Sequence, residues 1–166
     1  MITIFAGQTT MQRSAFYAFA LPLFLVTTLA RAQTEDRAER WRDNCERGWN
    51  NDRARFCELR TYTISPATRI SVDAGPNGGV SFYGENRRDV RIVARVQASA
   101  DDDATASAIA RQIRIITDGG QIRAEGPSQR GDDSWSVSYD VYVPNQANLE
   151  ANTENGGSPP TMLEAR

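Results

Sequence analysis

The sequence lacks histidine and lysine altogether, since all 19 of its basic side chains are arginine, and it contains only two cysteines. Without imidazole there is no histidine general base and no histidine metal ligand. Without lysine there is no amine for a Schiff base and no lysine for a phosphate-binding loop. These absences exclude several common catalytic classes, and we expect a non-enzymatic protein that needs no cofactor.

Residues 1–32 have the features of a secretory signal peptide. Arg13 precedes an apolar run from Ala15 to Leu29, and Ala30-Arg31-Ala32 supplies the small residues of a cleavage site. The start is either the first residue or Met11. A retained membrane anchor is the alternative, but the apolar run is short for a membrane-spanning helix. We therefore predict export to the periplasm, the cell envelope or the extracellular space.

Cleavage after Ala32 would leave 134 of the 166 residues, which is enough for one domain with a single core. The formal charge of this part is −4, because the first 32 residues hold two of the 19 arginines and none of the 21 acids. Nucleic acids attract positively charged surfaces. We therefore expect no nucleic-acid partner.

Cys45 and Cys57 both follow the predicted signal peptide. In an oxidising compartment such a pair is expected to form a disulfide, which would stabilise the fold by about 3 kcal/mol. Free thiols are the alternative, whereas a zinc site would need further soft ligands that the sequence lacks. Trp41 and Trp49 flank Cys45 at four-residue steps, a helical spacing. We expect residues 33–58 to form a charged, partly helical N-terminal cap; a frayed N-terminus is the alternative.

From residue 59 onward apolar and polar residues alternate, which is typical of strands with one buried face. The longest alternating run consists of Trp135, Val137, Tyr139, Val141 and Val143. We predict an all-β domain of seven or eight strands over residues 59–157, either β-solenoid-like or built from stacked antiparallel layers. Residues 158–166 are expected to form an irregular tail.

One segment breaks the alternation. Asp101-Asp102-Asp103 leads into an alanine-rich stretch, and we predict a short helix at about 103–112. Aspartate is a preferred N-cap residue and its charge favours the helix N-terminus. A calcium site is the alternative, but no loop with alternating oxygen ligands and a closing glutamate follows.

Glycine-containing turns begin at residues 77, 118 and 155, and their similar spacing suggests stacked β units. The stretch from Trp135 to Pro144, continuing through Asn148-Leu149 to Asn155-Gly156-Gly157, resembles the bacterial putative-adhesin domain family, a domain family of unknown function. The resemblance covers residues 63–157 and implies a secreted or surface β domain without established catalytic residues.

Members of that family continue with further strands after the Asn-Gly-Gly turn. Here Ser158-Pro159-Pro160 follows the turn, and proline cannot donate to a strand ladder. The comparison implies a shortened domain whose last strand, near residues 148–153, is an open edge. Because an open edge is a template for pairing, we expect self-association or instability.

Several side chains are candidates for a ligand surface. Tyr83 and Tyr142 could supply the aromatic row of a saccharide-binding module. Arg91 and Arg95 belong to a row with Arg114 and Arg123 that could bind anionic glycans or lipid headgroups. Such a row is more often the solvated face of a sheet.

Two acidic motifs give weaker signals. Arg130-Gly131-Asp132 has the form of a cell-attachment tripeptide, which we attribute to chance in a chain rich in these residues. Asp132, Asp133 and Asp140 could supply the carboxylate pair of a glycosidase, but we expect them to be solvated.

Three functional hypotheses follow. The leading hypothesis is a surface domain for adhesion or assembly, whose partner is a cell-surface glycan or protein. The second is a saccharide-binding module and the third is a carboxylate glycosidase.

Overall fold

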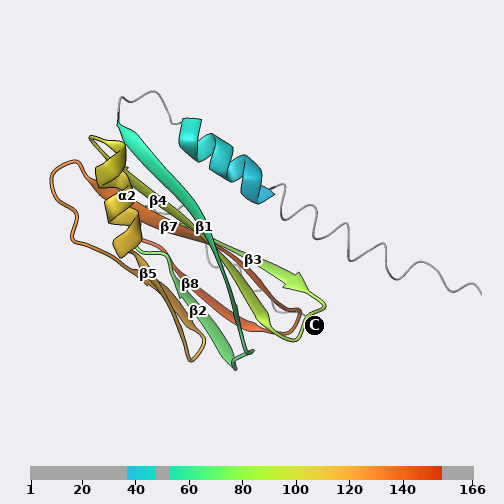
Figure 1. Cartoon of the computed structure of the whole chain (residues 1–166). Coiled ribbons are helices and arrows are strands. Elements are labelled where there is room, and N and C mark those ends of the chain that lie inside the picture. The colour runs from blue at the N-terminus through green and yellow to red at the C-terminus, as the bar shows by residue number, and fades with distance from the viewer. Residues whose placement is uncertain (1–36, 48–52, 155–166) are drawn as a thin grey trace, which may run out of the picture. The chain divides into compact units, whose positions relative to one another are not determined.

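The computed structural model describes residues 37–47 and 53–154 of the chain (Figure 1). The predicted signal peptide and the predicted tail lie outside these residues. A helix occupies residues 37–47. The remaining elements are β1 (Ala54–Ile64), β2 (Arg69–Asp73), β3 (Val80–Glu85), β4 (Val90–Ala100), α2 (Asp103–Gln112), β5 (Arg114–Asp118), β6 (Gln121–Glu125), β7 (Ser134–Pro144) and β8 (Asn148–Asn152).

The all-β prediction and the short helix at 103–112 are confirmed. β1 begins at Ala54, inside the range that the sequence assigned to the cap. In the described part of the chain, no helix is long and apolar enough to cross a membrane.

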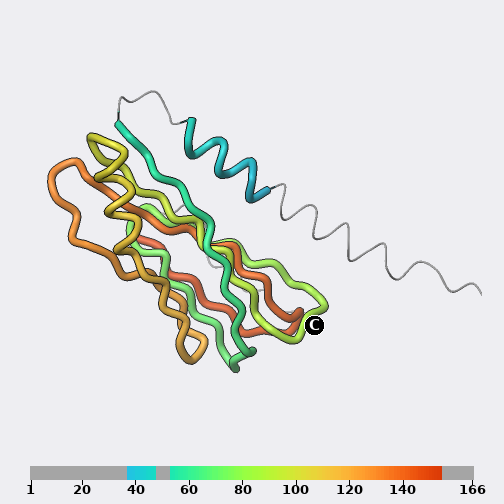
Figure 2. Tube along the Cα trace, in the orientation of Figure 1, coloured from blue at the N-terminus to red at the C-terminus, as the bar shows by residue number. Residues whose placement is uncertain are grey.

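The strands form two four-stranded sheets. Sheet A has the order β1-β4-β7-β3, and sheet B has the order β5-β6-β2-β8. Both sheets are mixed rather than antiparallel, because β3 pairs in parallel with β7 and β2 pairs in parallel with both β6 and β8. Figure 2 shows the chain passing repeatedly from one sheet to the other.

The hydrophobic core lies between the inner faces of the two sheets. Ile70 of β2, Ile92 of β4, Ile122 of β6 and Tyr139 of β7 are all at most 1% exposed. The predicted alternation of β7 is confirmed on this face, since its apolar residues from 137 to 143 are buried and Trp135 packs against the same core. Burial of these side chains is the main force that holds the sheets together.

The chain crosses from sheet B to sheet A in the same direction twice, from β2 to β3 and from β6 to β7. β8 then repeats the course of β2, and the ladder continues past the strand ends, where the Ala74 amide donates to the Asn152 carbonyl oxygen at 3.0 Å. The turn at 118–120 closes an antiparallel hairpin between β5 and β6. The turns at 77 and 118 therefore join strands in different ways, because a glycine pair suits a hairpin as well as a crossing. The turn at 155–157 lies outside the described residues.

Helix α2 has both ends satisfied by side chains. Asp102 caps its N-terminus and accepts hydrogen bonds from the Thr105 amide and the Thr105 hydroxyl, at 2.9 and 2.7 Å. Both bonds lower the pKa of Asp102, and the bond from the Thr105 hydroxyl has the larger effect. At the other end, Arg60 of β1 donates to the carbonyl oxygens of Ala110 and Ile113, at 2.9 and 2.5 Å. The capping interpretation of the aspartates is confirmed, and α2 is fastened to the edge strand of sheet A.

Gly78 stands where the crossing from β2 to β3 passes close to other backbone. A Cβ atom at this position would overlap the carbonyl oxygens of Ala74 and Val137. At the neighbouring Gly79 the nearest atom to such a Cβ is the Ser138 hydroxyl oxygen, at 3.9 Å. The first glycine is therefore required by close approach and the second is not.

We predict that Gly78→Ala lowers the free energy of unfolding by about 2 kcal/mol or more, because two carbonyl groups must move. Gly79→Ala is the matched control and should change stability by no more than about 0.5 kcal/mol. Urea denaturation of both variants measures the difference, and equal stabilities would contradict the close approach.

Candidate functional site

The structure brings Tyr83, Tyr142, Arg91 and Arg95 together on the outer face of sheet A. The predicted arginine row is split, because Arg114 of β5 and Arg123 of β6 lie in sheet B. Tyr83 of β3 lies opposite Tyr142 of β7, and Tyr142 lies opposite Arg91 of β4. Arg95 is four residues further along β4 on the same face, because side chains of a strand alternate. These residues were predicted from separate segments, and only the pairing of three strands makes them neighbours.

The tyrosines and arginines form a continuous stack. The rings of Tyr83 and Tyr142 are 4.9 Å apart between centroids and inclined by 22°. The Arg91 guanidinium lies over Tyr142 at 4.1 Å from the ring centroid, and the Arg37 guanidinium lies over Tyr83 at 4.9 Å. Arg37 also donates a hydrogen bond to the Tyr83 hydroxyl. Contacts of these kinds each contribute about 0.5–1.5 kcal/mol.

The stack covers Tyr142, which is only 4% exposed. A saccharide-binding surface needs exposed aromatic rings, and the predicted row is therefore not available at Tyr142. The reason is tertiary: Tyr83 and Arg91 pack on the Tyr142 ring, and the sequence alone did not indicate either contact.

The prediction that the Asp140 carboxylate is solvated is wrong, because Asp140 is only 6% exposed. It lies on the outer face of sheet A beside Arg95, whose guanidinium nitrogen is 3.4 Å from the carboxylate. Burial raises the pKa of Asp140, while the charges of Arg95 and Arg37 oppose the rise. Burial outweighs the two arginines, so the ionised form is disfavoured in the folded state.

The predicted glycosidase carboxylates do not come together around Asp140. Asp133 precedes β7 and Asp140 lies near the middle of that strand, so the rise per residue separates them by roughly 20 Å. A glycosidase pair needs about 5–9.5 Å. Asp132 is exposed, and the Asp133 carboxylate accepts a hydrogen bond from Arg53 at 2.9 Å.

The predicted disulfide between Cys45 and Cys57 is confirmed, with Cα atoms 6.2 Å apart. Phe56 of β1 packs against the core, so its neighbour Cys57 faces outward. The disulfide therefore joins the helix at 37–47 to the outer face of sheet A. The same helix carries Arg37, which contacts Tyr83 at the opposite edge strand of the sheet.

Two residues of this arrangement were not predicted from the sequence. Arg37 was one of many charged residues in the cap, and nothing in its neighbourhood marked it as the partner of Tyr83. Arg53 binds Asp101 and Asp133 together, at 2.6 and 2.9 Å. No sequence signal for either contact exists, because both depend on residues more than 40 positions away. Within the described segments, no group of three or more acidic or cysteine side chains is arranged to hold a metal ion.

We predict that Asp140→Asn stabilises the protein relative to wild type above the raised pKa of Asp140. The folded state binds this proton more tightly than the unfolded state, so wild-type stability rises as pH falls through that pKa toward 3.8. The advantage of the variant should therefore shrink in acid. Urea denaturation of both proteins between about pH 3 and 8 measures the difference in their free energies of unfolding. A stability difference that does not vary with pH would contradict the burial of an ionisable group.

We also predict that Cys45→Ala combined with Cys57→Ala lowers the free energy of unfolding by about 2–4 kcal/mol. Reduction of the wild type should give a similar loss, measured by denaturation with and without reductant. Arg37→Gln is the control that keeps the disulfide, and it should cost about 1 kcal/mol through the lost contact with Tyr83. If the double variant is as stable as wild type, the covalent attachment of the helix does not contribute to the fold.

No family model matches the sequence, and no curated protein matches it. The chain is similar to the solved structure of a putative cell adhesion protein from Clostridium sporogenes, with 7% identity over 59% of this chain and 47% of that one, and a TM-score of 0.29.

Two further solved structures have comparable scores. A putative adhesin from Parabacteroides distasonis is 8% identical over 58% of this chain and 40% of that one, with a TM-score of 0.30. A putative adhesin from Parabacteroides merdae is 11% identical over 58% and 39%, with a TM-score of 0.28. The chain thus spans less than half the length of each of these structures, and membership of the family that its sequence resembles stays a prediction.

Proposed function

We propose that this chain is an exported, non-enzymatic β domain that serves surface adhesion or assembly through the end of its two sheets formed by β3 and β8. Export is supported by the disulfide between Cys45 and Cys57, because disulfides persist in oxidising compartments outside the cytosol. The predicted signal peptide is consistent with it. Assembly is supported by the course of the strands, which is the observation that carries the proposal.

Within the described residues, the β3–β8 end is an incomplete layer. The crossing joins β2 of sheet B to β3 of sheet A. On one side both strands have a neighbour, because β2 pairs with β6 and β3 pairs with β7. On the other side only sheet B continues, with β8. Among the described residues β3 is the last strand of sheet A, and a further strand parallel to it would complete the layer.

The two ends of sheet A differ in how their edge strands are protected. β1 is fastened to α2 through Arg60. β3, with the sequence VSFYGE, contains no proline and only one charged residue. Arg37 contacts the ring of its Tyr83, while no strand among the described residues pairs with its outer backbone edge. An unpaired edge strand with no proline and little charge is a template for pairing with another chain. The occupant we propose is a second copy of this chain, with the β3–β8 ends of the two copies meeting.

β8 offers a position at which pairing can be blocked without breaking the fold. Its Asn152 carbonyl faces β2, since it accepts from Ala74, so the backbone of the preceding Ala151 faces away from β2. A proline at 151 therefore removes an amide that the fold does not use.

We predict that Ala151→Pro weakens self-association about tenfold or more, whereas Ala151→Val, which adds similar volume and keeps the amide, leaves it unchanged within about twofold. Analytical ultracentrifugation of the full chain over a concentration series measures both. A wild type that is strictly monomeric at high concentration, or equal losses in both variants, would exclude assembly through this edge.

A further inference from the structure

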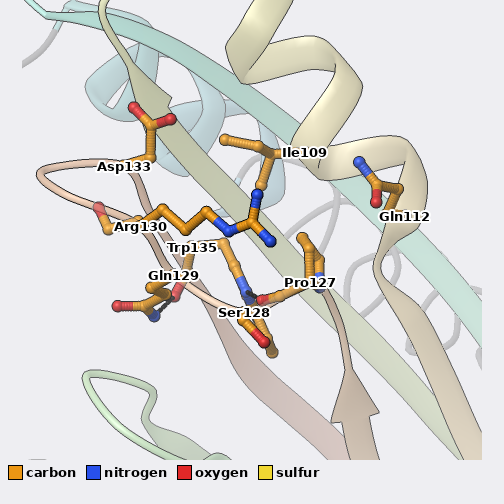
Figure 3. A pocket seen from close by; sticks show the side chains of 9 residues that line it. Ile109, Gln112, Pro127, Ser128, Gln129, Arg130, Asp133 and Trp135 are labelled. Atoms are coloured by element: carbon orange, nitrogen blue, oxygen red, sulfur yellow. Dashed lines mark hydrogen bonds between the residues drawn. The ribbon is translucent and has the colours of Figure 1, made fainter.

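A pocket of about 330 Å³ lies between α2 and the loop that leads from β6 to β7 (Figure 3). Its apolar wall is formed by Trp135 and Ile109. Gln112, Gln129, Arg130 and Asp133 are its polar groups. The volume is at the lower end of the range for ligand sites and matches a ligand built on a single small ring.

Trp135 is held rigidly in this pocket. Its indole N–H donates to the Pro127 carbonyl oxygen at 2.8 Å, and its own carbonyl oxygen accepts from the Gln129 amide at 3.3 Å. Gly126 lies directly against the ring, where a Cβ atom would come within 2.7 Å of ring carbons. A second pocket of about 180 Å³ is also lined by Trp135, so the ring borders two hollows. The indole is thus a fixed apolar surface that is open to small molecules.

The pocket lining contains one arginine, Arg130, and one aspartate, Asp133. The Asp133 carboxylate is engaged by Arg53, which binds Asp101 as well. Arg130 is exposed, and within residues 37–47 and 53–154 it has no hydrogen-bond or ion-pair partner for its guanidinium. Figure 3 shows this guanidinium extending over the pocket, between Ile109 and Trp135. The turn that presents it is fixed by a hydrogen bond of 3.1 Å from the Asp133 amide to the Arg130 carbonyl oxygen.

We propose that this pocket binds a carboxylate-bearing sugar of the uronic acid class. The apolar face of the sugar ring packs on Trp135, and its carboxylate pairs with Arg130, whose planar fork matches a carboxylate. The Gln112 side-chain N–H₂ donates to the Ala108 carbonyl oxygen at 3.0 Å, which leaves its oxygen to accept from a sugar hydroxyl. This inference rests on the proposed function, because it names the ligand class that an adhesive domain would bind.

The arrangement also gives Arg130 a role different from the cell-attachment tripeptide. Asp132 is exposed in the same turn, where Gly131 has a φ of 58°. The arginine side chain, however, lies over the Trp135 pocket, as Figure 3 shows. The residue that the sequence placed in a chance triplet is therefore the cationic group of the pocket lining.

The test is a protein-observed ¹H–¹⁵N NMR titration of the disulfide-bonded full chain with glucuronate, and with glucose as the matched uncharged sugar. We expect glucose to bind about tenfold or more weakly than glucuronate, since a charged hydrogen-bonded pair is lost. The Trp135 indole N–H resonance should shift with glucuronate. Equal affinity for the two sugars, or no binding of glucuronate, would overturn the proposal.

Two variants locate the site. Arg130→Gln should weaken glucuronate binding about tenfold or more, and Arg111→Gln, an exposed α2 arginine outside the pocket lining, should change it by less than about twofold. Equal losses in both would indicate nonspecific attraction and overturn the site. N-acetylalanine binding as tightly as glucuronate would show that the carboxylate alone is read, and would overturn the sugar class.

The outcome is separable from that of the assembly test. Ala151→Pro should bind glucuronate as wild type does, and Arg130→Gln should self-associate as wild type does. A wild type that self-associates but does not bind glucuronate would contradict only the pocket proposal. A wild type that binds glucuronate but stays monomeric would contradict only the assembly proposal.

Discussion

The parallel pairing of β2 with both β6 and β8 is the constraint on which the rest of the structure depends. Parallel neighbours cannot be joined by a tight turn, so the chain must leave the sheet and return before it can add the next strand. Here it leaves through sheet A, which is how β3 and β7 become parallel neighbours as well. This course also builds the core. The two strands joined by each crossing lie in opposite sheets, and their apolar side chains pack against one another between the sheets.

The crossings also determine where the functional features lie. The connection from β6 to β7 runs through residues 126–133 and places Trp135, Arg130 and Gln129 beside α2. The connection from β2 to β3 is shorter and needs Gly78 because it passes close to neighbouring backbone. Within the described residues, β8 extends sheet B beyond β2, but no strand extends sheet A beyond β3. The end formed by β3 and β8 therefore differs from the end formed by β1 and β5. The proposed ligand pocket and the proposed assembly edge thus lie in separate regions.

The outer face of sheet A serves a structural role that arginine makes possible. Arg37 and Arg91 each lay a planar cation on a tyrosine ring, and Arg95 faces the buried carboxylate of Asp140. A guanidinium is weakly hydrated and stacks on aromatic faces, whereas a lysine ammonium is a strongly hydrated point charge. The disulfide attaches the helix at 37–47 to this face, and Arg37 of that helix lies over Tyr83. Tyr142 is covered by Tyr83 and Arg91, whereas Trp135 lines two pockets.

Local residue patterns and composition were enough to predict the strands, α2 with its aspartate cap, and the cysteine pair. They also selected Tyr83, Tyr142, Arg91 and Arg95 as a group. Tertiary structure alone decided that Tyr142 and Asp140 are buried, that Arg37 completes the stack, and that Arg130 and Trp135 share a pocket with α2. The physical reason is that burial and pairing depend on which strands become neighbours, and the parallel crossings set this between residues far apart in the chain.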